Sequence, residues 1–116
     1  MQKKKHPYND GMASFYRVKE ITNTFGAKSN PVSKNDMEFI EKLAYTEKTK
    51  RQQDYEFAEQ NSKELSKKIV TQLRKEINNN MKVIDDNILY DVITIDFDRE
   101  NNEMYIYLQE VREIAG

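Results

Sequence analysis

Hydrophobic and polar residues alternate through much of the chain with the period of two that is typical of half-buried β-strands. The rhythm is clearest in three apolar runs near the carboxyl end, Met81–Ile84, Ile88–Phe97 and Met104–Val111. Asp and Asn dominate the two segments between these runs, Asp85–Asn87 and Asp98–Asn102. Because Asp and Asn tolerate left-handed backbone angles and hydrogen-bond their own backbone, they are typical of hairpin turns. The pattern predicts a three-stranded antiparallel meander.

Both faces of this predicted meander carry apolar or aromatic side chains. In the long strand, one face is predicted to hold Leu89, Ile93, Ile95 and Phe97, and the other Tyr90, Val92, Thr94 and Asp96. In the last strand, Met104, Ile106 and Leu108 alternate with Tyr105, Tyr107 and Gln109. A sheet that is apolar on both faces must be covered on both. The pattern therefore favours a small closed barrel, or a sheet covered by a helix or a neighbouring subunit.

Two further strands are predicted upstream. The first is Met12–Ile21, with a bulge where Phe15 and Tyr16 follow one another. The second is Met37–Tyr45. Its predicted apolar face holds Met37, Phe39, Leu43 and Tyr45, with Glu41 as the exception and Ile40 interrupting the opposite face. The segment between the strands, Asn23–Asp36, is rich in Gly, Ser, Asn and Pro and is predicted to be a long loop.

Residues 46–77 admit two interpretations. The segment is rich in helix formers and has no Gly or Pro, so propensity favours one long helix. A break at Asn61-Ser62 instead allows a helix followed by a strand, in which Leu65, Ile69, Thr71 and Leu73 alternate with Ser66, Lys68, Val70 and Gln72. Periodicity does not choose between the two.

The composition bounds what such a chain can be. Its 116 residues suit a single domain, which we expect to comprise a flexible basic arm (1–11) and a barrel (12–116). Apolar residues make up 37% and charged residues 34%, so much of the surface is charged or covered by a partner. The chain has no cysteine and no apolar run long enough for a transmembrane helix. We expect a protein of a cytosol-like compartment.

The charges are unevenly distributed along the chain. Residues 1–50 carry ten Lys and Arg against six Asp and Glu, which gives +4, and residues 51–80 carry +1. Residues 81–116 carry three against nine, which gives -6. Opposite charge at the two ends of one chain suits head-to-tail contacts between copies, or contact with a charged partner.

No arrangement of catalytic or metal-binding residues stands out. His6, the only histidine, lies in the predicted mobile arm, where a general base would not be held near its target. Asp96, Asp98 and Glu100 resemble the start of a calcium loop, but the later glycine and glutamate are missing. We therefore expect no cofactor, no metal and no enzyme activity. Lys3–Lys5 and the seven tyrosines leave nucleic-acid binding as an alternative.

In its order of features, the chain resembles the head closure (head-completion, or stopper) proteins of the siphophage head–tail connector family. Three stretches carry the resemblance along nearly the whole chain. They are the opening Lys5–Gly11, the middle Glu41–Leu73 with its acidic–aromatic segment Lys50–Gln60, and the closing strands Lys82–Val111. One departure is the lack of the Trp that family members often carry near the second strand.

The resemblance implies a mainly β fold, a small antiparallel barrel with one short helix in a crossover and long loops. The helix is expected near Thr49–Asn61 and the next strand near Leu65–Leu73. It further implies a monomer that assembles into a ring, typically a dodecamer, below the phage portal and adaptor. There it would close the DNA channel after packaging, without sequence specificity, and dock the tail. Its location would be the virion, and the host cytoplasm before assembly.

Within this expectation, Thr46–Asn61 is the candidate channel-closing segment, with Lys50, Arg51, Gln53, Asp54, Tyr55 and Glu56 as its residues. The loop Asn23–Asp36 is the candidate contact to a neighbouring ring or tail. Candidate residues of the subunit or tail interface are Lys28, Lys34, Asp96, Asp98 and Glu100. The alternatives are another connector component, such as a tail-completion or adaptor protein, and a small nucleic-acid-binding barrel.

Overall fold

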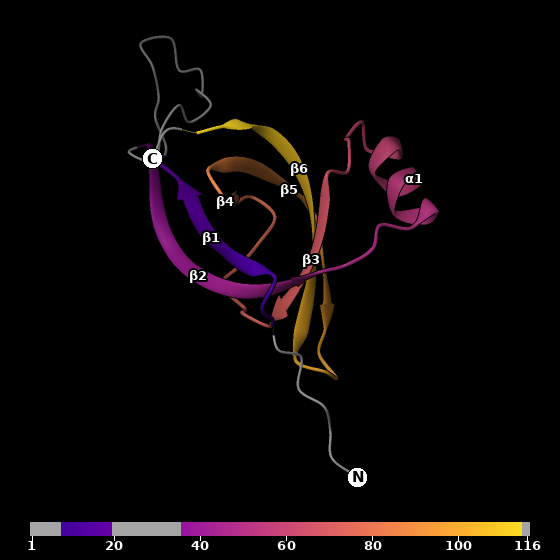
Figure 1. Ribbon diagram of the computed structural model, residues 1–116, viewed down its shortest axis with the longest axis horizontal. Coiled ribbons are helices and arrows are strands. Elements are labelled where there is room, and N and C mark those ends of the chain that lie inside the picture. The colour runs from indigo at the N-terminus through magenta and orange to yellow at the C-terminus, as the bar shows by residue number, and fades with distance from the viewer. Residues whose placement is uncertain (1–7, 20–35, 115–116) are drawn as a thin grey trace.

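The computed structural model describes residues 8–19 and 36–114, which form a closed antiparallel β-barrel and one short helix (Figure 1). The elements are β1 (Gly11–Val18), β2 (Met37–Glu47), α1 (Gln52–Gln60), β3 (Lys67–Gln72), β4 (Lys82–Asp85), β5 (Ile88–Asp98) and β6 (Glu103–Glu113). Around the barrel the strands follow the order β1-β2-β3-β6-β5-β4, and β4 closes the circuit against β1. The predicted fold class and the closing meander are confirmed.

The middle of the chain folds as a helix followed by a strand, so the single long helix is wrong. α1 ends at Gln60, and Ser62 takes a left-handed backbone with φ 58° that stops the helix. The Lys63 N–H then donates to the Ala58 carbonyl across this turn. Downstream, Ile69 and Val70 are both almost fully buried although they point to opposite faces of β3. This burial outweighs the helix propensity of the segment.

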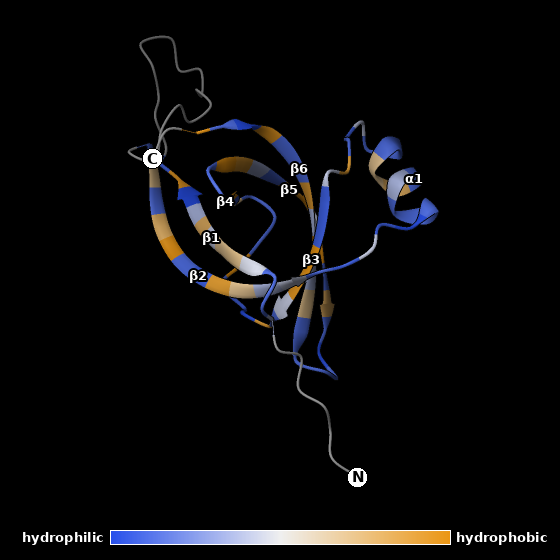
Figure 2. Cartoon of the chain, in the orientation of Figure 1, coloured by the Kyte–Doolittle hydropathy of each residue, from blue (hydrophilic) through white to orange (hydrophobic). Residues whose placement is uncertain are grey.

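The barrel interior is filled by one apolar cluster. Its buried members are Ala13, Phe15, Leu43, Tyr45, Ile69, Ile77, Met81, Val83, Tyr90, Val92, Met104, Ile106 and Leu108. The predicted alternation of β6 is confirmed, since Met104, Ile106 and Leu108 face this cluster. In Figure 2, apolar and polar bands alternate along β2, whereas α1 is mainly hydrophilic. The hydrophobic interior therefore belongs to the strands, and α1 lies outside it.

Two bulges correct the predicted faces. In β5, Val92 pairs with Leu108 and Thr94 with Tyr107, so Ile93 is an extra residue in the ladder. The alternation changes phase there, which places Tyr90, Val92 and Ile95 toward the interior. The prediction that Leu89, Ile93, Ile95 and Phe97 share one face is therefore wrong.

In the first hairpin, the register shifts between Phe15 and Tyr16, where the sequence predicted a bulge. The extra residue is Ile40 of β2, because Phe15 pairs with Glu41 and Tyr16 with Phe39. Phe39 consequently leaves the face it was predicted to share with Leu43, and it is 55% exposed. Its ring meets that of Tyr16 edge-on, with centroids 5.7 Å apart.

A second, smaller apolar cluster lies on the outer side of the β1–β4–β5 wall. It consists of Met37, Ile84, Leu89 and Ile114, with Tyr16 packed against them. Ile84 pairs with Ser14 and Leu89, whereas its neighbour Val83 belongs to the interior cluster. This outer cluster buries part of the wall that the sequence left apolar on both faces.

Several predicted segments extend beyond the described residues. β1 ends at Val18, and Ile21 is not among the described residues. The loop Asn23–Asp36 lies outside them except for Asp36, and so do residues 1–7 of the basic arm, including His6.

Candidate functional site

α1 begins where the chain leaves β2 and turns back toward the barrel wall. Arg51 is extended, with φ -104° and ψ 163°, and serves as the N-cap. Its backbone N–H donates to Asp54 Oδ2 over 2.9 Å, so Asp54 satisfies one of the donors left free at the start of a helix. The first turn of α1 is thereby organised around one carboxylate.

The same carboxylate joins α1 to the barrel. Lys68 of β3 donates from Nζ to Asp54 Oδ2 over 3.0 Å, and each side chain is only 6% exposed. Burial alone would raise the pKa of Asp54, but the hydrogen bonds from Arg51 and Lys68 outweigh it and lower that pKa. The Asp54 carboxylate is therefore ionised at neutral pH.

The Lys68 ammonium also lies over two aromatic rings of β6. It is 5.2 Å from the ring centroid of Tyr107 and 6.0 Å from that of Tyr105. A cation held against ring faces gains further stabilisation from the quadrupoles of the rings. Lys68 and the two rings thus form a preformed site on the outer wall of the barrel that binds the Asp54 carboxylate.

The structure gives the predicted channel-closing residues different roles. Lys50 donates from Nζ to the Ser66 carbonyl over 2.9 Å and lies 6.0 Å from the Tyr55 ring. Lys50 and Asp54 therefore fix the start of α1, whereas Arg51, Gln53, Tyr55 and Glu56 are exposed. Asp54 is buried, so it is an anchor of the predicted segment and not part of its exposed surface.

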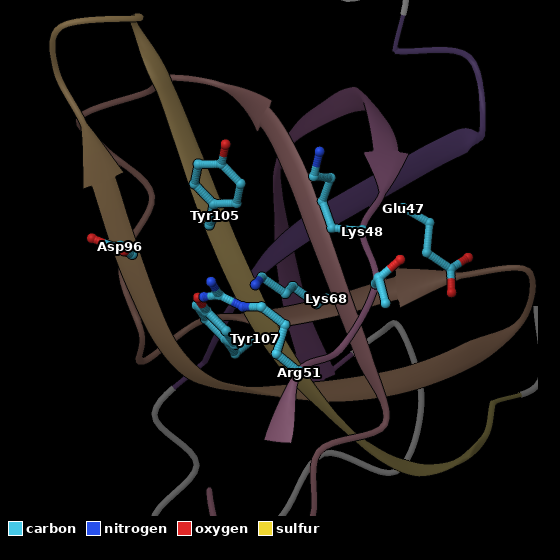
Figure 3. Close-up of a pocket in the computed structure, with 8 residues that line it drawn as sticks. Glu47, Lys48, Arg51, Lys68, Asp96, Tyr105 and Tyr107 are labelled. Carbon is cyan, nitrogen blue, oxygen red and sulfur yellow. The ribbon is translucent and has the colours of Figure 1, made fainter. Parts of the chain in front are cut away.

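Between α1 and the wall lies a trough made of two adjoining depressions, which we call the α1 trough. The larger, a cleft of about 500 Å³, is lined by Glu47, Lys48, Thr49, Arg51, Lys68, Asp96, Tyr105 and Tyr107 (Figure 3). The smaller, a groove of about 270 Å³, is lined by Asp54, Phe57, Thr94, Ile95, Asp96 and Tyr107. Asp96 and Tyr107 belong to both.

The α1 trough carries charges of both signs. Lys48 and Arg51 stand at the cleft with Glu47 and Asp96, and the Lys68 charge is already matched by Asp54. In Figure 3, Lys48 and Arg51 come from the connection after β2, whereas Tyr105 projects from β6. Positive charge does not dominate here, unlike in a surface made for a polyanion. The trough suits a partner that presents both apolar and charged groups.

The predicted interface residues are only partly brought together. Asp96 lines the α1 trough, while Asp98 and Glu100 lie two and four residues further, at the β5–β6 connection. Asp98 accepts hydrogen bonds from the backbone and side-chain nitrogens of Asn101, and these lower its pKa. Lys28 and Lys34 lie outside the described residues.

A second polar cluster joins three strands at one end of the interior. Lys67 donates from Nζ to Asp85 Oδ2 over 2.7 Å and to Tyr45 Oη over 2.9 Å, and Tyr45 donates to Asp85. Burial and the bond to Asp85 raise the pKa of Tyr45 to about 12. Burial would lower the pKa of Lys67, but its two partners raise it overall. All three groups are partnered, so this cluster stabilises the fold and offers no reactive group.

Metal binding would require several carboxylate or histidine side chains to converge among the described residues. The described residues hold no group of three or more His, Cys, Asp or Glu side chains able to bind a metal ion. The carboxylates of the calcium-like sequence, Asp96, Asp98 and Glu100, thus do not form such a group. No helix in the described part of the chain is long and apolar enough to cross a membrane.

The fold and the trough define a small antiparallel barrel with a helix pinned to its outer wall. No model of a known protein family matches the chain, and no curated protein matches its sequence. The features that bear on function are therefore α1, its trough, and the order of elements that resembles the head closure family.

Sequence reasoning missed the Asp54–Lys68 pair and the Tyr45–Lys67–Asp85 cluster. The signal was the pair Lys67-Lys68 within a strand pattern. Consecutive strand residues point to opposite faces, so one of two adjacent lysines must point into the barrel and the other to its outer wall. A buried lysine needs a carboxylate partner, and this requirement would have directed attention to Asp54 and Asp85.

Proposed function

We propose that this protein is a phage head closure protein, a structural component that forms a ring at the head–tail interface and closes the DNA channel. One observation carries the proposal. The single helix of the described chain stands beside the barrel in the β2–β3 connection, outside the hydrophobic interior (Figure 1). That is the place at which the resembled family carries its helix.

The attachment of α1 suits a segment that projects from a ring subunit. Asp54 pins the first turn to Lys68, and Lys50 adds a bond to the Ser66 carbonyl. The exposed side chains Gln53, Tyr55 and Glu56 are left free to face other molecules. A helix fixed at its start can present bulk in a channel without relying on the barrel core.

The charge of α1 also supports channel closure by bulk. α1 contains Asp54, Glu56 and Glu59 and no Lys or Arg. An acidic helix repels nucleic acid phosphates, so it can obstruct DNA without binding it tightly. Release of the genome at infection requires such weak affinity. The proposed partners are further copies of this chain, the portal or adaptor above the ring, and the tail or tail-completion protein below it.

A nucleic-acid-binding barrel is the second candidate, because Lys48 and Arg51 lie in the cleft with Tyr105 and Tyr107, but Glu47 and Asp96 share that cleft. It is tested by measuring whether the protein shifts the electrophoretic mobility of labelled single-stranded oligonucleotides, and whether this binding weakens as the salt concentration rises. Binding at low salt that disappears on Tyr105→Ala and Tyr107→Ala would establish it. The mainly helical adaptor has no support from this mainly β chain.

The proposal is tested in the phage or prophage that encodes the chain. Disrupting its gene should yield DNA-filled heads that leak their genome, together with free tails that do not join. A plasmid copy of the gene should restore infectious particles. Infectious particles produced without the gene would overturn the proposal, and so would heads that never fill, because closure follows packaging.

A further inference from the structure

The described residues expose six large apolar side chains. They are Met12, Phe39, Tyr55, Phe57, Phe97 and Val111. Phe39 has the greatest exposed fraction of these, 55%. The Phe39 ring packs edge-on against Tyr16, which itself packs on the outer cluster. Phe39 therefore projects from the outer wall of β2 in a fixed orientation. Covering this exposed ring with apolar atoms of a partner would be favourable, because it removes apolar surface from water.

A groove large enough for a phenyl ring lies on the other side of the barrel. The groove of the α1 trough has a volume of about 270 Å³ and is lined by Phe57, Ile95 and Tyr107 among others. A cavity of about 150 Å³ is enough to hold a benzene ring, so the groove has room for a phenyl side chain. Phe57, one of its walls, is itself 46% exposed and would be covered by such a ring.

The strand order places Phe39 and the groove of the α1 trough on different sides of the barrel. In the closed circuit, two strands lie between β2 and β5 in either direction. Phe39 is on β2, and the groove is built on Thr94, Ile95 and Asp96 of β5. One molecule cannot fill its own groove with its own Phe39, but a second copy can. A contact between opposite sides of identical subunits is heterologous and continues from copy to copy.

Charges beside the two features complement each other. Lys42 pairs with Ser14, one outward position along β1 from Tyr16, and is therefore close to Phe39 on the outer wall. Its ammonium has no ion-pair partner among the described residues, and neither has the exposed carboxylate of Asp96 at the groove. An opposite pair at the rim would orient the two copies as they meet.

We propose that the groove of the α1 trough receives Phe39 of a second copy of this chain, with Lys42 of that copy facing Asp96. The inference rests on the proposed function and deepens it, because it assigns the contact between neighbouring subunits of the ring. One aromatic ring and one rim ion pair make a small interface, which predicts a weak contact in dilute solution. Such a contact agrees with a protein that assembles only where other components gather it.

The full chain lacks cysteine, so an introduced cysteine is its only thiol. A crosslink between two introduced cysteines therefore shows that the two positions lie close together. Glu38→Cys, beside Phe39 on β2, and Gln53→Cys, one turn from Phe57 on α1, are made as single variants so that both aromatic rings remain. They are mixed at about 1 mM and treated with a short bis-maleimide. The mixture should give several-fold more crosslinked dimer than either single variant. A chain carrying both substitutions should give a ladder of multimers. Val111→Cys, also exposed but on neither feature, replaces one partner as the matched control.

Charge reversal adds a test of orientation. Lys42→Glu or Asp96→Lys alone should lower the crosslinked fraction, and the two combined in one chain should restore it. Lys75→Glu, an exposed lysine elsewhere, should have no effect. Crosslinking of Glu38→Cys with itself above the Val111→Cys level would mean a two-fold contact and would overturn the inference, as would a mixture no better than that control.

The proposed subunit contact and the proposed function can be refuted independently of each other. If the crosslink is missing both in solution and in particles, while disruption of the gene still releases DNA, the subunit contact is wrong and the proposed function stands. If the crosslink forms but particles without the gene keep their DNA and join tails, the self-contact stands and the proposed function is wrong.

Discussion

Asp54 of α1 and Lys68 of β3 form a buried ion pair with a 3.0 Å contact, and each side chain is only 6% exposed. Because Asp54 also accepts the Arg51 backbone N–H, one carboxylate both starts the helix and holds it to the barrel. Removing one member of a buried pair leaves the other charge unmatched, which costs about 3–5 kcal/mol. Asp54 thus couples the helix to the barrel, in addition to the bond from Lys50 to the Ser66 carbonyl.

Asp54→Asn should therefore release α1 without unfolding the barrel. The amide keeps the shape of the side chain but loses the charge that matches Lys68. We expect faster amide hydrogen exchange throughout α1 and unchanged protection in β5 and β6. Glu56→Gln is the control on the same helix, since its carboxylate accepts from Gln52 of α1 and makes no ion pair with the described part of the barrel. Unchanged exchange in α1 of the Asp54→Asn variant would show that other contacts hold the helix.

The Tyr45–Lys67–Asp85 cluster should make the fold sensitive to alkali. Tyr45 ionises near pH 10 in the unfolded chain, but its folded pKa is about 12. Its contribution to stability is therefore complete below pH 10 and is lost as the pH rises toward 12. The raised pKa of Lys67 acts in the same direction above pH 10.5.

Tyr45→Phe should flatten this pH dependence. The free energy of unfolding, measured by urea denaturation from pH 8 upward, should fall less steeply by up to about 1.4 kcal/mol per pH unit. At neutral pH the variant should lose about 1 kcal/mol for the missing hydrogen bonds. Ile106→Val, which weakens the core but removes no ionisable group, is the control. An unchanged slope in Tyr45→Phe would contradict the assignment.

Gly11 gives the Tyr45 ring the space it occupies. A Cβ atom on Gly11 would lie 2.5 Å from Tyr45 Oη and 2.7 Å from Cζ. The ring cannot move away freely because Asp85 and Lys67 hold its hydroxyl. Gly11→Ala should lower the free energy of unfolding by about 1–3 kcal/mol in urea denaturation. Ser14→Ala, on the outer wall of the same strand, should change it by less than about 0.5 kcal/mol.

The acidic side chains near the β5–β6 connection are predicted to serve contacts between molecules. Replacing Asp96, Asp98 and Glu100 together by Asn or Gln should leave the melting temperature of the monomer nearly unchanged. Self-association measured by sedimentation at high concentration should weaken, because the negative partner of a neighbouring copy is gone. The control, which likewise removes three carboxylates, replaces the exposed residues Glu64, Glu110 and Glu113 by Gln. Loss of the folded monomer instead would mean that the three carboxylates hold the hairpin itself.

The fold class could be predicted because period-two alternation and Asp/Asn turns are local signals. Apolar residues on both faces of β6 predicted a closed or covered sheet, and the interior position of Ile106 confirms it. The bulge of the first hairpin was predicted at Phe15 and Tyr16, but its extra residue is Ile40 of β2, and the bulge at Ile93 was not predicted. Each bulge changes the phase of the alternation through tertiary pairing. This is why Phe39 and Leu89 were assigned to the wrong faces.

The candidate site was harder to predict than the fold. The helical segment Lys50–Gln60 was expected, but its anchoring through Asp54 depends on Lys68, which follows 14 residues later on another element. Such a pairing is set by the closure of the barrel, and no local pattern encodes it. The trough likewise exists only because the β2–α1 connection passes beside Tyr105 and Tyr107, and α1 places Phe57 near Tyr107.

Genome retention in filled heads tests the central claim most directly. Phage lacking the gene is complemented with a chain in which a short Gly-Ser linker replaces Lys50–Gln60 and Lys68→Met removes the unmatched charge. Its control keeps the helix and carries Asp54→Ala with Lys68→Met. The measurement is the fraction of packaged DNA that becomes accessible to nuclease. We predict that the linker variant exposes its DNA while the control retains it, whereas full retention by the linker variant would contradict closure of the channel by this segment.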